Sequence, residues 1–119
     1  FAALLPSPGA TAYDLILAWD LFNYFDLRAL EALVRRLSLG CRSGTRLFAL
    51  VSDLPAIPAS PMTFKIISRD ELGCEIRNRE TRPSPRHQPR DIARLMAGFT
   101  DCCSFLLRHG LREYVFAFK

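Results

Sequence analysis

The chain has 119 residues, half of them apolar, and its 16 basic and 12 acidic side chains leave a formal net charge of +4. This length predicts one domain, and so small a positive excess argues against a dedicated nucleic-acid-binding protein. No apolar run approaches the roughly 18 residues that span a bilayer, and the start FAALLPSPGA lacks the basic region and apolar core of a signal peptide. We therefore expect a cytoplasmic chain without a membrane partner. Because it begins with Phe rather than Met, we also expect it to be part of a longer one.

The first half of the chain has the pattern of a strand, a helix and a second strand. Tyr13–Ala18, YDLILA, is a short and nearly continuous apolar run, typical of a parallel strand buried on both faces. Asp26 is a good N-cap for the next segment, whose apolar residues recur at helical spacing, and Gly40 is suited to end that helix. A polar turn, CRSGT, then precedes the strand Arg46–Val51. This order predicts a right-handed crossover between two parallel strands.

The second half predicts connections, a helix and a terminal pair of strands. In chain order these are a Pro-rich connection (54–61), a hairpin (63–68 with 74–78), an exposed Arg- and Pro-rich loop (79–90), a helix (89–97) and two strands (102–108 and 113–118). Pro89 suits the first turn of the helix, and Gly98 suits its end. The short link His109–Arg112 can join only antiparallel neighbours.

Polar and aromatic side chains follow the first strand directly. In a doubly wound sheet, ligands bind outside the carboxyl ends of the parallel strands. The residues that follow the strand Tyr13–Ala18 should therefore lie at that edge. A cofactor site needs flat apolar walls and polar groups, and the residues that can provide them here are Trp19, Asp20, Leu21, Asn23 and Tyr24. The alternative is structural, with Trp19 and Tyr24 packing on the following helix and Asp20 starting a turn.

The order of elements resembles the second half of class I S-adenosylmethionine-dependent methyltransferases. The residues that carry the resemblance are YDLILAWDLFNYFD, the amphipathic helix, LSLGCRSGTRLFALV, and the ending Phe99–Gly110 and Leu111–Lys119 with its GLREYVFAF. The family has a fourth strand of the type "fDlIl", a Pro-Gly-Gly-like turn before the fifth strand, and a final antiparallel strand. Here the turn is Arg42–Ser43–Gly44–Thr45, with one of the glycines.

The resemblance implies a cofactor site of which this chain holds only one side. By position, the cofactor-lining segment falls on Ala18, Trp19 and Asp20, while Asn23 and Tyr24 are near enough to face cofactor or substrate. The family's Gly-rich turn, which holds the methionine part of S-adenosylmethionine, has no counterpart in the 119 residues, nor does the acidic residue that binds the ribose. We therefore expect the chain to be inactive by itself and not to bind the cofactor tightly.

The chemical candidates are few. Asp20 is either a base that takes a proton from the methyl acceptor or a group that only orients a donor. His87 falls in the predicted mobile loop, and His109 in a tight turn where a structural role is expected. Arg82 and Arg86 are candidates for binding an anionic substrate or an RNA backbone, or they belong to a solvated loop. The spacing of the cysteines and histidines matches no zinc pattern, so no metal is predicted.

These observations predict an α/β fold: a partial, doubly wound Rossmann-like sheet in which a βαβ unit is followed by a helix and a C-terminal antiparallel hairpin. Residues 1–119 are expected to form one partial domain, with 54–88 as a possible substrate-recognition insertion. The function implied is methyl transfer from S-adenosylmethionine to a small-molecule acceptor. The alternatives are a non-catalytic binding or dimerisation module, which pairs through the exposed edge of the first strand, and an Arg-mediated RNA-binding domain.

Overall fold

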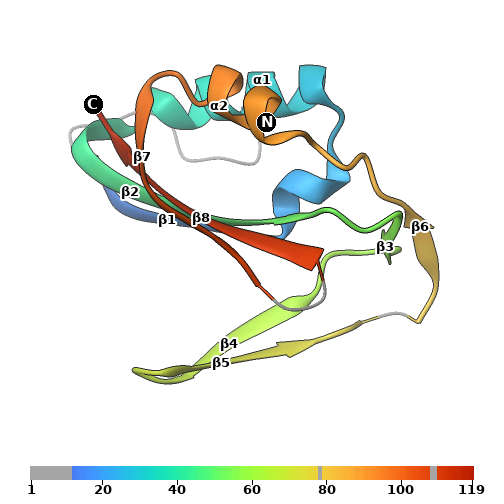
Figure 1. Cartoon of the computed structure of the whole chain (residues 1–119). Helices are drawn as coiled ribbons and strands as arrows, with labels where there is room; N and C mark the ends of the chain where they lie inside the picture. Colours follow the sequence, from blue (N-terminus) through green and yellow to red (C-terminus); the bar gives the residue numbers. More distant parts are fainter. Residues whose placement is uncertain (1–11, 78, 108–109) are drawn as a thin grey trace.

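The structure, a computed structural model, describes residues 12–77, 79–107 and 110–119 (Figure 1). Predictions for the opening loop, for His109 and for the end of the strand 102–108 fall wholly or partly outside these ranges. The described elements are β1 (Tyr13–Trp19), the 3₁₀ helix η1 (Leu21–Tyr24), α1 (Leu27–Ser38), β2 (Cys41–Ser52), β3 (Ala56–Pro58), β4 (Thr63–Ser68), β5 (Glu71–Glu75), β6 (Thr81–Pro83), α2 (Pro89–Leu95), β7 (Phe99–Leu106) and β8 (Leu111–Phe118).

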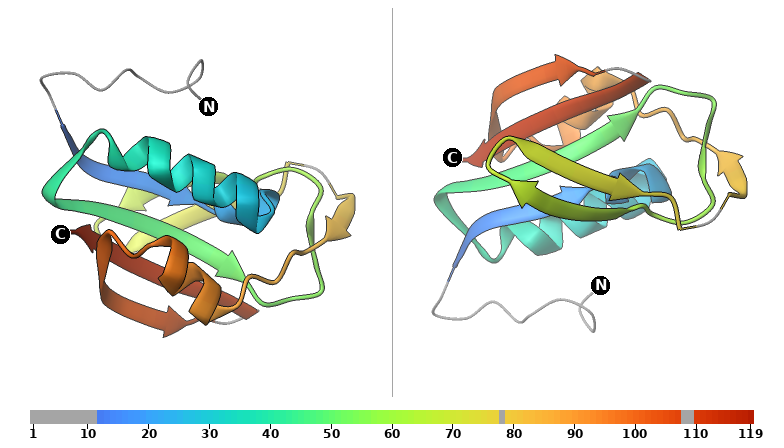
Figure 2. Two further views of the ribbon diagram at one scale, coloured as in Figure 1. Left: turned by 90° about the horizontal axis from the view of Figure 1, so that it is seen from above. Right: turned by 90° about the horizontal axis from the view of Figure 1, so that it is seen from below.

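A four-stranded sheet in the order β1-β2-β8-β7 organises the chain. The pair β1–β2 is parallel, while β8 runs antiparallel to both β2 and β7. The βαβ unit and the antiparallel C-terminal hairpin are therefore confirmed, and the fold is a mixed α/β fold. Helices α1 and α2 lie on the same face of the sheet (Figures 1 and 2). A doubly wound sheet carries helices on both faces, and the described helices do not provide that arrangement.

The core lies between the helices and this face. Asp26 caps α1 as predicted, its side chain accepting a hydrogen bond from the backbone N–H of Ala29 at 2.8 Å. The apolar stripe of the two helices packs against alternate residues of the central strands, and burial of each large side chain contributes about 1.5–3 kcal/mol. Buried members of this core include Phe22, Leu30, Leu33, Val34, Leu37, Leu47, Ala49, Ile92, Met96, Phe99, Tyr114 and Phe116.

The first strand is buried on one face only, which corrects the prediction of burial on both. Ala18 is buried, but Leu15 and Leu17 are 55% and 41% exposed. Successive side chains of a strand point to opposite faces, and the described helices cover only one of them. The continuous apolar run therefore does not distinguish a strand covered on both sides from one with an open apolar face.

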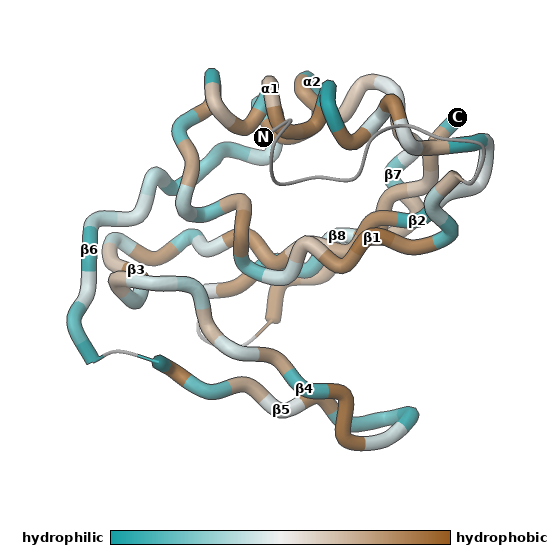
Figure 3. The backbone as a smooth tube through the Cα atoms, turned by 180° about the vertical axis from the view of Figure 1, so that it is seen from behind, coloured by the Kyte–Doolittle hydropathy of each residue, from teal (hydrophilic) through white to brown (hydrophobic). Residues whose placement is uncertain are grey.

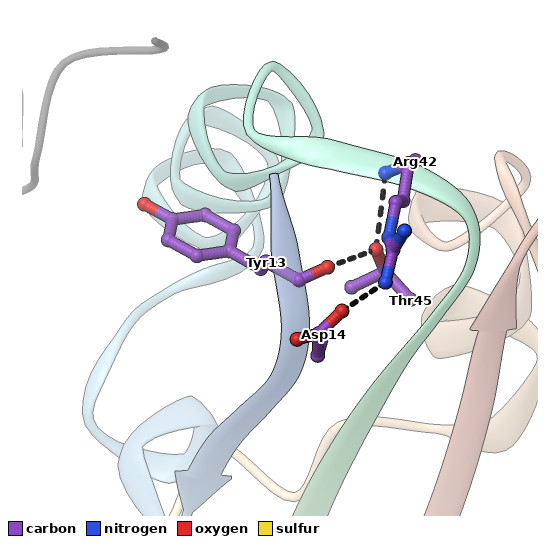
Figure 4. Close-up of polar contacts among 4 residues, drawn as sticks. All are labelled: Tyr13, Asp14, Arg42 and Thr45. Atoms are coloured by element: carbon purple, nitrogen blue, oxygen red, sulfur yellow. Dashed lines mark hydrogen bonds and ion pairs between the residues drawn. The ribbon is translucent and has the colours of Figure 1, made fainter. Parts of the chain in front are cut away.

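The predicted turn Arg42–Thr45 belongs to β2 instead (Figure 4). The hydroxyl of Thr45 donates to the carbonyl oxygen of Tyr13 at 2.5 Å and accepts from the backbone N–H of Arg42 at 3.0 Å, and the Arg42 guanidinium pairs with Asp14. The pairing of β1 with β2 shifts register beside this segment. A Cβ on Gly40 would lie 2.4 Å from the Tyr13 ring, so Gly40 is required for close packing.

Two small antiparallel strand pairs lie between β2 and α2, and one of them is the predicted hairpin. β4 has its predicted bounds, but β5 begins three residues before the predicted partner because the turn is tight. The predicted connection and exposed loop each contain a short strand, and these strands, β3 and β6, pair antiparallel. The β4–β5 hairpin projects on the side of the sheet opposite the helices (Figures 1 and 2), and it carries an apolar stretch with Ile66 and Ile67 exposed (Figure 3).

The C-terminal elements are displaced slightly from their predicted bounds. Helix α2 begins at Pro89 as predicted but ends at Leu95, before Gly98. Strand β7 begins at Phe99, three residues early, because the chain re-enters the sheet at once. In the part of the chain that the structure describes, no helix is both long and apolar enough to cross a bilayer.

Candidate functional site

The carboxyl end of β1 carries a sharp change of chain direction at Trp19. Its φ angle is 51°, a left-handed conformation that bulky residues rarely adopt. The indole stacks on Phe64 of β4, with ring centroids 4.8 Å apart and planes at 8°, and meets Phe48 of β2 edge-on at 5.6 Å. Trp19 thus packs against the hairpin and β2, whereas the structural alternative placed it on the following helix.

Asp20 is buried, with 3% of its surface exposed. Its Oδ2 accepts a hydrogen bond from the backbone N–H of Met62 at 2.9 Å. Burial raises the pKa of the Asp20 carboxyl, and hydrogen bonds from the backbone N–H groups of Met62 and Asp20 itself offset part of that effect. The carboxyl therefore lies beneath the segment 58–62 and is shielded from bulk water.

Tyr24 also bonds to the segment 58–62. Its hydroxyl donates to the carbonyl oxygens of Pro58 at 2.8 Å and Ser60 at 3.1 Å. Burial and the negative charge of Asp20 raise the pKa of Tyr24, while the Arg82 guanidinium, 5.7 Å from the ring centroid, acts in the opposite direction. The predicted residues Asp20 and Arg82 therefore both act electrostatically on Tyr24.

Asn23 holds η1 to the end of β2. Its side-chain N–H donates to the carbonyl oxygen of Leu50 at 3.2 Å, and its Oδ1 accepts from the backbone N–H of Ser52 at 2.8 Å. The side chain is 3% exposed. A substrate contact remains a prediction for Asn23, whereas these two bonds give it a positioning role.

Arg86 lies away from the Tyr24 cluster. Its guanidinium is 3.8 Å from the carboxylate of Asp53, just beyond the end of β2, and both side chains are more than half exposed. Such an exposed pair contributes on the order of 0–1 kcal/mol. The structure thus brings Arg82, but not Arg86, to the edge formed by Asp20 and Tyr24.

His87 is the residue whose environment the sequence did not reveal. The predicted mobile loop is wrong at this position, because His87 is 9% exposed. Its Nε2 lies 3.0 Å from the carbonyl oxygen of Phe22 and 2.9 Å from that of Phe25. The partners are more than 60 positions away, so only the neighbouring Pro85 and Pro89, which stiffen the segment, hinted at an ordered histidine.

Comparisons with known proteins identify the fold. No family model matches the chain, and neither does any curated protein. The structure is similar to that of the pyocyanin biosynthetic protein PhzM (TM-score 0.58, 14% identity, 92% of this chain and 31% of that one). It is also similar to the glycopeptide N-methyltransferase MtfA complexed with S-adenosyl-L-homocysteine (TM-score 0.58, 8% identity, 93% of this chain and 57% of that one). The chain has the fold of part of a methyltransferase. It spans about a third of PhzM and just over half of MtfA.

The described residues fit an S-adenosyl cofactor in part. Such a cofactor needs a flat apolar wall for its adenine, an acceptor for the ribose hydroxyls and backbone N–H groups for its amino-acid end. Trp19, Leu17 and Phe48 provide apolar surface around a cavity of about 300 Å³ on the open face of the sheet. The Asp20 carboxyl is already bonded to Met62, and the sequence has no Gly-rich turn. Within the described residues, no cluster of His, Cys, Asp and Glu is suited to a metal.

Proposed function

We propose that this chain forms one wall of the site for S-adenosylmethionine-dependent methyl transfer to a small-molecule acceptor. The observation that carries the proposal is the correspondence of fold with MtfA over 93% of the chain, since that protein is complexed with S-adenosyl-L-homocysteine. The cluster of Trp19, Asp20 and Tyr24 at the carboxyl end of β1 supports it independently, because this edge is where a parallel pair of strands presents ligand-binding groups.

In this proposal Trp19 lines the cofactor, and Asp20, Tyr24 and Arg82 lie toward the acceptor. The side chain of Ala18, which the sequence also assigned to the cofactor, is buried in the core with α1 and is not part of this wall. When bound, the cofactor supplies a methyl group on a positively charged sulfur. The residues of the chain orient the acceptor, exclude water and hold a proton. Asp20 suits the last task, because burial raises its pKa and so makes the carboxylate a stronger base. The Asn23 amide holds η1, and with it Tyr24, against β2.

The remainder of the cofactor site must come from outside these residues. The glycines at 9, 40, 44, 73, 98 and 110 form no Gly-x-Gly-x-x-Gly pattern. Amino-acid and phosphate-like groups are commonly held by such turns, whose backbone N–H groups approach a ligand closely. The 119 residues alone should therefore bind S-adenosyl-L-homocysteine weakly, and a polypeptide that adds a strand and a Gly-rich turn should bind it tightly.

The single tryptophan makes this testable, since Trp19 lies in the proposed wall. We would titrate S-adenosyl-L-homocysteine while recording tryptophan fluorescence, with the 119-residue chain and with the longest polypeptide that the natural reading frame encodes. We expect quenching with a micromolar Kd only in the longer polypeptide. Unchanged fluorescence in both would contradict the proposed function, and micromolar binding by the 119 residues alone would contradict a shared site.

The open apolar face favours a second candidate, a binding or dimerisation module without catalysis. Leu15 and Leu17 of the edge strand β1 are exposed, and an unpaired strand edge can accept another strand. This candidate predicts association through β1 and no response to S-adenosyl-L-homocysteine. The RNA-binding alternative receives less support, because Arg82 lies over Tyr24 and Arg86 faces Asp53.

A further inference from the structure

A small polar cavity lies where the end of β2 meets the start of β8 and the first turn of α2. Its volume is about 130 Å³, enough for a ligand of a few non-hydrogen atoms. Its polar lining comes from segments far apart in the sequence: Ser52, Asp53, His87, Gln88, Arg112 and Tyr114. None of these residues lines the open face around Trp19, so the two cavities are separate.

His87 presents one unused acceptor atom to this cavity. The carbonyl oxygens of Phe22 and Phe25 can only accept, so Nε2 carries the proton that they share. In the neutral ring, Nδ1 is then an acceptor. Within the described residues Nδ1 has no hydrogen-bond partner. Since no buried side-chain nitrogen or oxygen in these residues lacks a partner, Nδ1 is accessible to solvent, and His87 is one of the residues that line the cavity. A ring that is 9% exposed thus offers its one free polar atom to a ligand.

Arg112 provides a positive charge in the lining of the same cavity. Its recorded polar contact is a long one, from Nη1 to the Ser104 hydroxyl at 3.4 Å. No carboxylate lies within ion-pair distance of it in the part of the chain that the structure describes. The guanidinium also acts on the Tyr114 hydroxyl, whose pKa it lowers against the larger effect of burial. An unpaired guanidinium beside a hydroxyl donor is suited to a carboxylate.

Asp53 supplies the complementary charge. Its carboxylate lines the cavity, and its distance of 3.8 Å from Arg86 makes a weak, exposed pair that leaves acceptor capacity free. The cavity therefore combines one cation with a carboxylate and a neutral acceptor nitrogen. A simple anion would be repelled by Asp53, and a simple cation would be repelled by Arg112. A ligand that carries both charges can pair with each group.

We propose that this cavity binds a small zwitterion of the α-amino acid class, with its carboxylate on Arg112 and its ammonium group donating to His87 Nδ1 and Asp53. The assignment uses only groups of this chain and needs no cofactor. Only a role of this ligand as the methyl acceptor would rest on the proposed function. The binding itself does not.

The probe is glycine, titrated into the full 119-residue chain while the ring signals of His87 are followed by NMR. Acetate, which lacks the ammonium group, and methylamine, which lacks the carboxylate, are the matched ligands. We expect glycine to bind at least about 5-fold more tightly than either, the effect of one or more added charge-assisted hydrogen bonds. Equal affinities for the three ligands, or no shift of the His87 signals with glycine, would overturn the proposal.

Two variants test the named groups. His87→Gln keeps an N–H donor near the position of Nε2 but has no acceptor at the position of Nδ1, so it should weaken glycine binding about 5- to 10-fold and leave acetate binding unchanged. Arg112→Gln should weaken both. If the His87→Gln protein does not fold, Arg112→Gln and the comparison of the three ligands still test the proposal. Because no cofactor is present in these titrations, their failure is distinguishable from a failure to bind S-adenosyl-L-homocysteine.

Discussion

The carboxylate of Asp20 and the backbone N–H of Met62, 42 positions apart in the sequence, lie 2.9 Å apart and form a hydrogen bond. With the two bonds from the Tyr24 hydroxyl, this contact fastens residues 58–62 across the carboxyl end of β1. We call this segment the strap. It shields the carboxyl group that the sequence singles out for chemistry, so access to Asp20 depends on how firmly the strap is held.

Asp20 should make the stability of the protein depend on pH. Its pKa in the folded protein is raised by burial above the ordinary 3.8, so the folded state binds the proton more tightly than the unfolded chain. Its contribution is therefore fully present below pH 3.8 and is lost as the pH rises through the raised pKa. Asp20→Asn remains neutral and can still accept from Met62, so its free energy of unfolding should exceed that of the wild type at pH 7.

Urea denaturation across a pH series measures this difference, which should shrink toward acid pH. Asp70→Asn removes a negative charge at an exposed turn and serves as the control. If Asp20→Asn were less stable than the wild type at pH 7, the charge on Asp20 would have to stabilise the fold rather than strain it.

The Tyr24 hydroxyl should control the opening of the strap. Tyr24→Phe removes the donor to Pro58 and Ser60, at a cost of about 1 kcal/mol in the free energy of unfolding. Hydrogen exchange of the backbone amides of Ala59, Ser60 and Met62 should become faster, while exchange in α1 stays the same. Tyr13→Phe is the matched control, because the Tyr13 hydroxyl has no hydrogen bond within the described residues. Equal exchange in the two variants would count against the strap.

The stack between Trp19 and Phe64 should be visible in fluorescence. Phe64→Ala removes the partner ring and admits water to one face of the indole, so the emission should shift to longer wavelength. The loss of an aromatic pair costs about 0.5–1.5 kcal/mol beyond the area exposed. Phe105→Ala, on an exposed site of β7, should leave the emission unchanged. An unshifted spectrum for Phe64→Ala would mean that the hairpin does not rest on Trp19 in solution.

The open face of β1 should promote self-association. We expect the isolated chain to form dimers or aggregates, because exposed leucines lie beside an unpaired strand edge. Replacing both Leu15 and Leu17 by Lys should shift the chain to monomer in sedimentation experiments. Leu39→Lys changes a still more exposed leucine just after α1 and should have no such effect. A wild-type chain that sediments as a monomer and unfolds cooperatively would refute this prediction.

Local patterns in the sequence were sufficient for the central elements. The apolar run Tyr13–Ala18, the cap at Asp26 and the short link His109–Arg112 are each local features of the sequence. The structure confirms the parallel pair, the capped helix and the antiparallel ending. The boundaries of the elements were predicted less accurately than their types. Arg42–Thr45 reads as a turn, yet Thr45 bonds to the Tyr13 carbonyl and continues the strand.

The run YDLILAW thus determined by itself that a strand forms here and which side chains follow it, because alternation and capping are properties of adjacent residues. Tertiary structure decided what those side chains meet. The burial of Asp20 beneath the strap, the stack of Trp19 on Phe64 and the ordering of His87 by η1 all join residues at least 40 positions apart. Such contacts are set by how the chain packs against itself, and no local pattern encodes them.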